Sequence, residues 1–205
     1  SCMTSTPTSS SDWAADNAAR IQGGGVRPLT ERGLVALVGT HESAKGLHAV
    51  ELGSGAGLEA QYLLQQGMSV DTLDCDASVE ATMAQLAMTG RVRHRTGLIE
   101  EWDPLPEADM ILANASLPFV PREHFWAVWQ RIRTSLRPGG VFAADLFGAD
   151  DSWASPDGTY LTRSEVDDLL DGLEVVELNE RNEDGRSFEG TKHWHTFTVI
   201  ARRPL

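Results

Sequence analysis

The stretch Ala49-Val-Glu-Leu-Gly-Ser-Gly-Ala-Gly57 determines the fold that we predict, because a short apolar run ends there in three alternate glycines. Val50 and Leu52 flank Glu51, as in a buried strand, and an amphipathic run from Leu58 to Gln66 follows. Without side chains, the backbone of the bend can approach a ligand closely. The helix beyond it offers unpaired N–H groups and the positive end of its dipole. The stretch predicts a strand, a bend and a helix that bind a nucleotide-like ligand.

Two classes of ligand use such a bend, and the residues around it favour one of them. A dinucleotide site has the pattern Gly-x-Gly-x-x-Gly, but the third residue after Gly55 is Leu58. Glu51, two residues before Gly53, would repel a pyrophosphate and attract an ammonium group. With Gly57 completing the alternation, the stretch resembles motif I of the class I S-adenosylmethionine-dependent methyltransferases.

A second acidic residue follows at a suitable distance. The segment from Met68 to Asp74 reads as the next strand, and Asp74 comes 21 residues after Gly53. A carboxylate about 20 residues on, at the tip of the neighbouring strand, accepts hydrogen bonds from ribose hydroxyls. The alternative is an aspartate that caps a helix or forms a turn, as Asp76 and Ser78 could also do.

Length and composition indicate one globular domain. The chain has 205 residues, of which 41% are hydrophobic and 23% charged. We expect residues 1–12 to form a disordered tail and residues 13–205 to form the methyltransferase domain. The sequence has neither an apolar run of membrane-spanning length nor a signal-peptide pattern. Because Cys2 lies in the tail, we expect no disulfide and no cysteine zinc site, and hence a cytoplasmic protein.

The charge balance argues against a nucleic-acid partner. The formal net charge is −13, from 30 acidic and 17 basic residues, whereas nucleic-acid binding depends on neutralising phosphates with Lys and Arg. The basic cluster of Arg91, Arg93 and Arg95 reads as the solvent side of a strand. We therefore expect a small-molecule partner, with neither nucleic acid nor membrane involved. The oligomeric state is not predicted.

Strands and helices alternate along the chain. The predicted strands are 48–52, 68–74, 92–96, 109–113 and 141–146, and the helices between them are 58–66, 79–88 and 122–136. A capping box at Thr162-Arg-Ser-Glu165 opens another helix. Two strands, 174–178 and 196–201, follow and are joined by a polar loop that contains Asp184-Gly185. This order indicates an α/β fold, a doubly wound parallel sheet with an antiparallel edge.

Two helices are expected before the first strand. Trp13 to Ile21 reads as a short helix, and Thr30 as the N-cap of a helix that carries Leu34 and Leu37 inward. The resemblance to the methyltransferases then implies a Rossmann-like, mostly parallel seven-stranded sheet in a single domain.

Ligands of such sheets sit at the carboxyl ends of the strands, and the resemblance implies which residues contact S-adenosylmethionine there. Leu98 stands where the family often has an acidic residue. Leu98 and Ile99 would supply an apolar wall for adenine, and Glu100 would be the substitute acceptor. The alternative is that Leu98 and Ile99 pack in the core. Asn114 either binds polar atoms of the ligand or is a plain turn residue. Arg20 and Arg27 are candidates to bind the methionine carboxylate, and the alternative for each is an ordinary surface arginine. The expected cofactor-binding residues are Glu51, Gly53, Ser54, Gly55, Gly57, Asp74, Cys75, Leu98, Ile99, Asn114 and Arg27.

His193 and His195 are the candidates for a general base, which an oxygen or nitrogen acceptor needs and a soft sulfur-type acceptor does not. Strand alternation places both on one face and Trp194 on the other. Structural roles and metal binding are the alternatives, and we expect no metal site. Next to the fourth strand, Phe125 is expected in the core and Trp126 at the substrate mouth.

The favoured function is a methyltransferase that moves a methyl group from S-adenosylmethionine to a small molecule and releases S-adenosylhomocysteine. Residues 146–153 and 192–195 resemble a small group related to tellurite-resistance and type-11 methyltransferases. The alternatives are a nicotinamide-dependent Rossmann oxidoreductase and a sensor that binds S-adenosylmethionine without turnover.

Overall fold

The structure, a computed structural model, describes residues 25–205. The predicted tail over residues 1–12, the predicted helix from Trp13 to Ile21, and Arg20 all lie outside the described residues.

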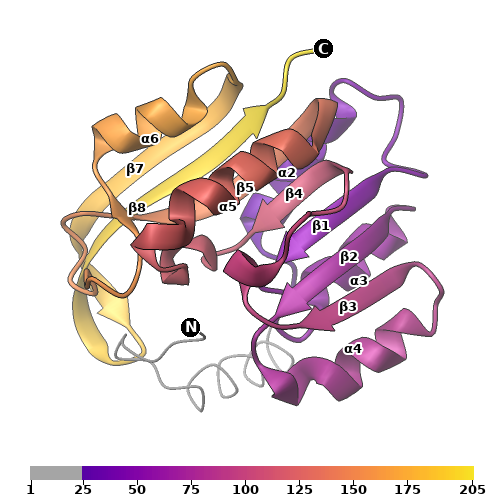
Figure 1. The fold of residues 1–205 in the computed structure, drawn as a ribbon, viewed down its shortest axis with the longest axis horizontal. Helices are drawn as coiled ribbons and strands as arrows, with labels where there is room; N and C mark the ends of the chain where they lie inside the picture. Colours follow the sequence, from indigo (N-terminus) through magenta and orange to yellow (C-terminus); the bar gives the residue numbers. More distant parts are fainter. Residues whose placement is uncertain (1–24) are drawn as a thin grey trace.

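One twisted sheet runs through the described chain (Figure 1). Its strand order is β3-β2-β1-β4-β5-β8-β7, and a short strand, β6, pairs with β5 beside this path. The strands are β1 His48–Leu52, β2 Ser69–Asp74, β3 Val92–Thr96, β4 Ala108–Ala113, β5 Leu136–Gly148, β6 Tyr160–Leu161, β7 Glu174–Ser187 and β8 Gly190–Arg202. The first five run parallel, and β8 is antiparallel to both β5 and β7. The predicted α/β fold with a mostly parallel sheet and an antiparallel edge is confirmed.

Helices cover both faces of the sheet. They are α2 Pro28–Val38, α3 Leu58–Gln65, α4 Glu80–Ala87, α5 Arg122–Ser135 and α6 Arg163–Leu170, with short 3₁₀ turns at Ala77–Val79, Ile99–Glu101 and Leu117–Phe119. The apolar faces of α2, α3 and α4 pack in one core cluster, and those of α5 and α6 in the other. Phe125 of α5 is fully buried, as predicted. The residues of the central strands β1, β4 and β5 alternate between these two clusters, which is why these strands read as apolar runs.

Helix α2 begins earlier than predicted. Its N-cap is Arg27, and Pro28 occupies the first helical position, where the missing N–H costs nothing. Thr30 is therefore a fully buried residue of the first turn, and its prediction as the cap is wrong. A Cβ atom at Gly33 would lie 2.8 Å from the Met110 side chain, so α2 rests closely on β4. This contact holds the start of α2 over the carboxyl ends of the strands.

The last two strands are longer than predicted. The sequence indicated a polar loop around Asp184-Gly185, but β7 continues through both residues to Ser187, and Gly185 pairs with Lys192. Polar side chains tolerate this pairing because the distal part of the hairpin is largely exposed. The hairpin extends past the end of β5, where Phe147 pairs with Thr196. Sequence patterning had also missed β6, which has only two residues.

The capping box at the start of α6 is confirmed, with the Thr162 hydroxyl accepting from the Glu165 N–H and the Glu165 carboxylate accepting from the Thr162 N–H. The three arginines of β3 and its approach are exposed, as predicted for the solvent side of an edge strand. Among residues 25–205, no helix combines the length and apolar character needed to cross a membrane.

Candidate ligand site at the carboxyl edge of the sheet

The glycine bend lies between β1 and α3, as the sequence predicts. Gly53, Gly55 and Gly57 all have positive φ, at 84°, 51° and 87°. The N–H groups of Gly53 and Ser54 donate to the carbonyl of Leu73 at 2.8 and 3.0 Å, so the bend is joined to the end of β2. The Ser54 side chain is buried and turned toward the bend itself, where its hydroxyl donates to the Gly55 carbonyl.

Asp74, the last residue of β2, holds the bend in place. Its Oδ2 accepts a hydrogen bond from the Gly55 N–H at 2.7 Å, and its Oδ1 accepts one from the Asp76 N–H at 2.8 Å. Burial raises the pKa of Asp74, and these two backbone N–H groups oppose that rise. Asp74 therefore has the turn role that the sequence left open as an alternative. Because a carboxylate has about four lone-pair positions, two remain for hydrogen bonds from a ligand.

Cys75 follows Asp74, and its sulfur is disulfide-bonded. The expectation that the cysteines form no disulfide is therefore wrong for Cys75, while Cys2 lies outside the described residues. Any contact of Cys75 with a ligand falls to its backbone.

The loop after β4 explains why Gly53 is a glycine. The Ser116 hydroxyl donates to the Leu52 carbonyl at 2.5 Å, and a Cβ atom at Gly53 would lie only 2.6 Å from the Ser116 Cβ. Ala115 beside it has a φ of 53°, which is uncommon for a residue with a side chain and typical of functional loops. The absence of a side chain at Gly53 thus admits the β4 loop, and contact of Gly53 with a ligand stays a prediction.

A row of polar side chains crosses three neighbouring strands on the face covered by α2. Glu51 of β1 is 1% exposed, Asn114 follows β4, and Asp145 of β5 accepts a hydrogen bond from the Thr198 hydroxyl at 3.0 Å. Burial raises the pKa of Asp145. The hydrogen bond from Thr198 and the positive charges of nearby arginines, Arg27 among them, act in the opposite direction but do not cancel the rise.

Two atoms in this region are buried without a hydrogen-bond partner among the described residues. The amide nitrogen of Asn114 donates to Thr30 Oγ1 at 3.1 Å, but its Oδ1 has no partner. The Nε atom of Arg27 also has none, its nearest charge being Glu59 Oε1 at 3.9 Å. Buried polar atoms are nearly always hydrogen-bonded, so an unpaired acceptor and an unpaired donor here are unusual.

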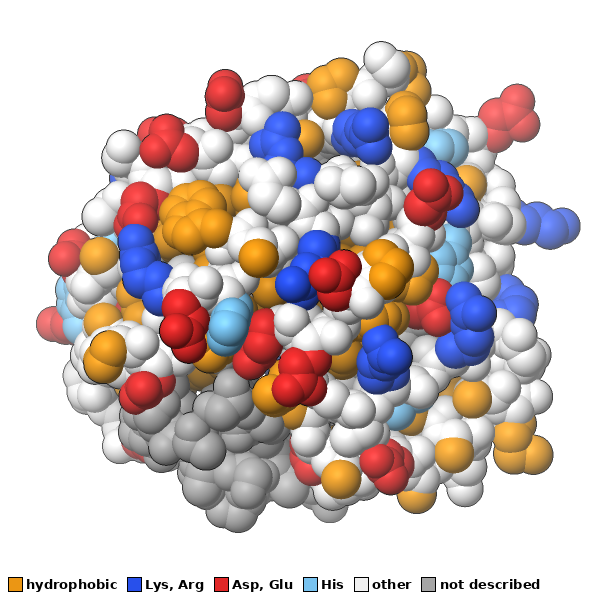
Figure 2. Space-filling model, in the orientation of Figure 1, with side chains coloured by type: hydrophobic (Ala, Val, Ile, Leu, Met, Phe, Trp, Pro, Cys, Tyr) orange, Lys and Arg blue, Asp and Glu red, His pale blue; other side chains and the backbone are white. Residues whose placement is uncertain are grey.

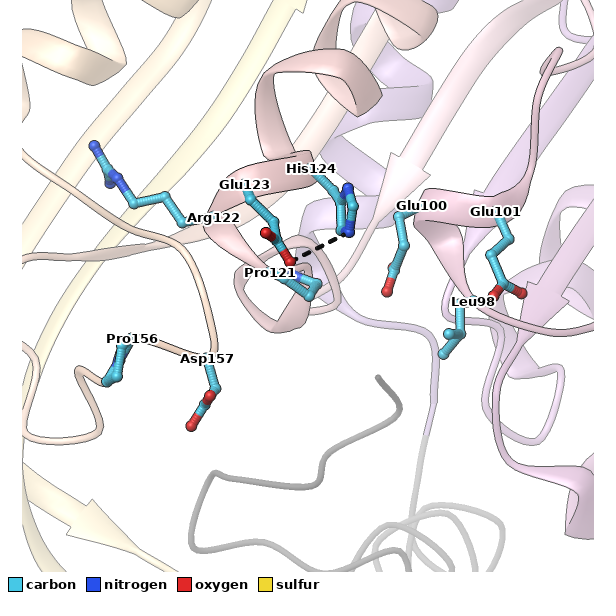
Figure 3. A pocket seen from close by; sticks show the side chains of 9 residues that line it. All are labelled: Leu98, Glu100, Glu101, Pro121, Arg122, Glu123, His124, Pro156 and Asp157. Atoms are coloured by element: carbon cyan, nitrogen blue, oxygen red, sulfur yellow. Dashed lines mark ion pairs between the residues drawn. The ribbon is translucent and has the colours of Figure 1, made fainter.

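A pocket of about 750 Å³ opens beside this edge (Figure 3). Three segments line it, the turn after β3, the start of α5, and the loop before β6: Leu98, Glu100, Glu101, Pro121, Arg122, Glu123, His124, Pro156 and Asp157. The first segment is joined to the end of β2, since the Gly97 N–H donates to the Asp74 carbonyl at 3.0 Å. The pocket therefore begins next to the glycine bend.

The two residues predicted as an adenine wall separate in the structure. Leu98 lines the pocket, whereas Ile99 packs against the core of the α5 face. The core alternative thus applies to Ile99. Trp126, predicted at the substrate mouth, is 40% exposed but does not line this pocket.

Comparison with known proteins relates this part of the chain to methyltransferases. A family model described as a methyltransferase domain matches residues 49–140, which include the bend, Asp74 and Asn114. Over these residues the chain is similar to that family.

The curated relatives are distant. Trans-aconitate 2-methyltransferase of Mycobacterium tuberculosis is 29% identical over 138 residues, which are 66% of this chain and 49% of the relative. The chain thus spans about half the length of the curated relatives that it matches.

Two solved structures share the fold. TehB from Haemophilus influenzae has a TM-score of 0.71 at 15% identity, covering 93% of this chain and 67% of TehB. A 1,6-didemethyltoxoflavin-N1-methyltransferase from Burkholderia thailandensis has a TM-score of 0.65 at 22% identity, covering 96% and 87%. At these identities the likeness shows the fold alone.

The two histidines predicted as candidate bases lie on the β7–β8 hairpin and do not line the pocket. His195 is 4% exposed. Its Nδ1 accepts from the Asp150 N–H at 3.0 Å, so a neutral ring carries its proton on Nε2, which lies 2.8 Å from Glu180. His193 contacts Asp184 and Asn182 on the same face of the hairpin, as alternation predicted. These contacts favour the structural alternative, and the base role stays a prediction.

The same hairpin anchors one wall of the pocket. The buried ammonium of Lys192 is bonded to the carboxylate of Asp151 and lies 4.2 Å from the ring centre of Trp153 and 4.3 Å from that of Trp194. Asp151 also accepts from the Trp153 and His195 N–H groups. Sequence analysis singled out the two stretches that contain Asp151 and Lys192 but not their pairing, because the partners are 41 residues apart and no local pattern joins them. In residues 25–205, no group of three or more His, Cys, Asp or Glu side chains is arranged to hold a metal ion.

We expect Gly53→Ala to destabilise the protein by about 2–4 kcal/mol, because the new Cβ combines left-handed strain with overlap on Ser116. Gly46→Ala is the matched control, since Gly46 has a φ of 81° and open space around its Cβ position. Urea unfolding of both variants measures the difference. Equal losses would show that the close approach of Ser116 has no energetic consequence.

We expect His94 to make stability fall in mild acid. Burial lowers its pKa against the attraction of Asp74 and Glu80, so below about pH 6.5 the unfolded chain binds more protons than the folded one. The free energy of unfolding then decreases as pH falls through this window. His94→Asn, which keeps a polar atom near the Thr72 hydroxyl, should reduce the decrease, whereas His41→Asn should not. Urea unfolding at about pH 7.5 and about pH 5.5 tests this, and an unchanged decrease in His94→Asn would contradict it.

Proposed function

We propose that this protein binds S-adenosylmethionine at the carboxyl edge of the sheet and transfers its methyl group to a small-molecule acceptor, releasing S-adenosylhomocysteine. The observation that carries the proposal is the pair of buried, unpartnered atoms near the start of α2. Arg27 Nε is a donor that suits the carboxylate of the methionine part, and Asn114 Oδ1 is an acceptor that suits its ammonium. The buried carboxyl groups of Glu51 and Asp145 on the same face add negative charge for that ammonium.

The other end of the cofactor has a matching set of residues. Asp74 lies at the end of β2, where its remaining lone pairs can accept from ribose hydroxyls. Leu98 offers an apolar wall beside it for the adenine, with Glu100 as the neighbouring acceptor. Relatives named trans-aconitate methyltransferases, and a fold neighbour crystallised with S-adenosylhomocysteine, support this assignment of the ligand.

Methyl transfer from a sulfonium needs alignment more than covalent help. A lone pair of the acceptor forms a bond to the methyl carbon while the carbon–sulfur bond breaks and its electrons stay on sulfur. A proton lost by the acceptor passes to water or to a nearby base. Holding the two reactants in line can supply about 7–11 kcal/mol of the barrier reduction. Hydrogen bonds join the bend and Asp74 to each other and to the end of β2, and they join α2 to Glu59 of α3 and Arg202 of β8, which gives the site the rigidity that alignment requires.

The two alternatives from the sequence are less well supported. A nicotinamide-dependent oxidoreductase lacks support among the matches described above, and Leu58 still breaks the dinucleotide pattern. A sensor without turnover uses the same cofactor site, so an acceptor assay distinguishes it from an enzyme. A cytoplasmic location remains a prediction of the sequence.

Replacement of Asp74 by Asn should weaken S-adenosylhomocysteine binding by about 1–3 kcal/mol, because a charged acceptor for the ribose is lost. Asp76→Asn is the control, since its Oδ1 accepts from the Ser78 N–H rather than holding the bend. Calorimetric titration with S-adenosylhomocysteine and with NADH measures both variants and the unaltered protein. Tighter binding of NADH, or unchanged affinity in Asp74→Asn, would refute the assignment.

Arg27→Gln should also weaken S-adenosylhomocysteine binding, by roughly tenfold, because the carboxylate loses a charged partner. Arg32→Gln, five residues further along the chain and inside α2, removes a surface ion pair with Glu177 at 3.0 Å and should leave the affinity unchanged. The same titrations distinguish the two positions. A loss of equal size in both variants would place the effect in the stability of α2 rather than in ligand contact.

A further inference from the structure

The helix that carries Arg27 begins with a residue that cannot cap it. Arg27 is the N-cap of α2, and its side chain makes no capping hydrogen bond. Ser, Thr, Asp or Asn is usual at this position, because a side-chain oxygen there accepts from an N–H of the first turn. An arginine side chain has only donors and cannot do this. Departures of this kind from local preference are typical of positions where the side chain has a function.

A buried carboxylate on the neighbouring helix holds the start of α2. Glu59 Oε1 accepts a hydrogen bond from the Arg27 N–H at 3.1 Å, across 32 positions of the chain. Charged side chains stand on the surface of the protein, as Figure 2 shows for one face, but the Glu59 side chain is only 2% exposed. Carboxylates are rarely buried to this extent unless positive charge or donors compensate them.

Two sources of positive charge lie close to the Glu59 carboxylate. One is the first turn of α3, in which Glu59 is the second residue and where the helix dipole favours a negative charge. The other is Arg27, whose Nε lies 3.9 Å from the same Oε1 atom that binds its backbone. The two charges attract each other at this distance, which is too long for a hydrogen bond.

One oxygen of Glu59 therefore acts on Arg27 in two ways. It fixes the backbone through the bond to the N–H, and it attracts the guanidinium without engaging the Nε donor. That donor stays buried and without a hydrogen-bond partner among residues 25–205. A direct hydrogen bond from Nε to Glu59 would occupy the donor. The observed geometry instead keeps it oriented and available, which lowers the cost of ordering Arg27 when a ligand binds.

The place of Glu59 in the chain connects Arg27 to the glycine bend. Glu59 follows Gly57, the last glycine of the bend, by two residues, and Gly57 is the N-cap of α3. The Gln61 N–H donates to the Gly57 carbonyl at 2.8 Å, so the bend continues directly into the first turn of the helix. A carboxylate anchored in this turn sets the position of Arg27 relative to the bend.

We propose that Glu59 is a positioning residue that holds Arg27 ready for the carboxylate of the methionine part of the cofactor. The inference rests on the proposed function and concerns the amino-acid end of the same ligand. Glu59 acts through Arg27 and does not itself contact the ligand. Its loss should therefore weaken the binding of ligands that carry the amino-acid part and spare ligands that lack it.

Two ligands that differ in this part test the proposal by calorimetric titration. S-adenosylhomocysteine carries the amino-acid carboxylate, whereas 5′-methylthioadenosine keeps the adenosine and the sulfur without it. We expect Glu59→Ala to weaken S-adenosylhomocysteine binding by about tenfold and to change the affinity for 5′-methylthioadenosine by no more than about twofold. Glu59→Gln keeps an oxygen that can accept from the Arg27 N–H and should restore most of the lost affinity. Equal weakening of both ligands, or unchanged S-adenosylhomocysteine affinity in Glu59→Ala, would overturn the proposal.

A double-mutant cycle locates the effect at Arg27 and uses S-adenosylhomocysteine alone. In the Arg27→Gln background, Glu59→Ala should weaken binding by no more than about twofold, because the side chain that Glu59 positions is already gone. A loss as large as the one in the Arg27 background would show that Glu59 acts elsewhere, and would contradict the proposal.

Leu64→Ala is the control for damage to α3. Leu64 lies in the same helix and packs in the core beneath it. Its replacement should lower the urea midpoint and leave the ratio of the two ligand affinities unchanged. A ratio that falls as in Glu59→Ala would assign the effect to the stability of α3 and refute the positioning role. Absence of S-adenosylhomocysteine binding in the unaltered protein would instead refute the proposed function itself.

Discussion

The site depends on the carboxylate of Asp74, which joins the tips of two neighbouring strands. One oxygen accepts the Gly55 N–H from the bend after β1, and the other accepts the Asp76 N–H after β2. A carboxylate that accepts two backbone N–H groups is held in one orientation, and burial raises its pKa while those bonds oppose the rise. The geometry of the bend and the direction of the remaining lone pairs are therefore set together. A ligand that uses Asp74 meets a site that is already formed.

Close packing brings the start of α2 to the loop after β4. The absence of a side chain at Gly33 lets α2 rest on β4 and β5, and the absence of one at Gly53 lets Ser116 approach β1. These two approaches bring the start of α2 and the loop after β4 together, so that Thr30 contacts Asn114. The unpartnered atoms of Arg27 and Asn114 result from this packing and not from any local motif. Binding of a zwitterion would satisfy both, which gives the site its specificity.

The pocket beside the bend is assembled from segments that are far apart in the chain. The start of α5 and the turn after β3 form two walls, and the loop before β6 forms the third. That loop is held from behind by the Lys192–Asp151 ion pair and its aromatic surroundings on the β7–β8 hairpin. A buried ion pair contributes little net stability by comparison with apolar packing, but breaking it is costly, so it suits the fixing of a loop position. The parallel half of the sheet thus carries the glycine bend and Asp74, and the antiparallel hairpin supports one wall of the pocket.

The sequence by itself determined the alternation of strands and helices, the glycine bend, and Asp74 at the next strand tip, because these depend on local periodicity and on short spacings along the chain. The strands 48–52 and 92–96 were predicted to the residue for this reason. It did not determine the length of the hairpin, because the pairing of Asp184 with His193 overrides the turn propensity of Asp-Gly. It also did not determine the place of Thr30, which is buried in the first turn of α2 instead of capping the helix. Only the tertiary structure decided which charges meet at the pocket, that Arg122 is turned outward by Glu165, and that His195 is enclosed. Those outcomes depend on contacts between residues tens of positions apart, and no local pattern encodes them.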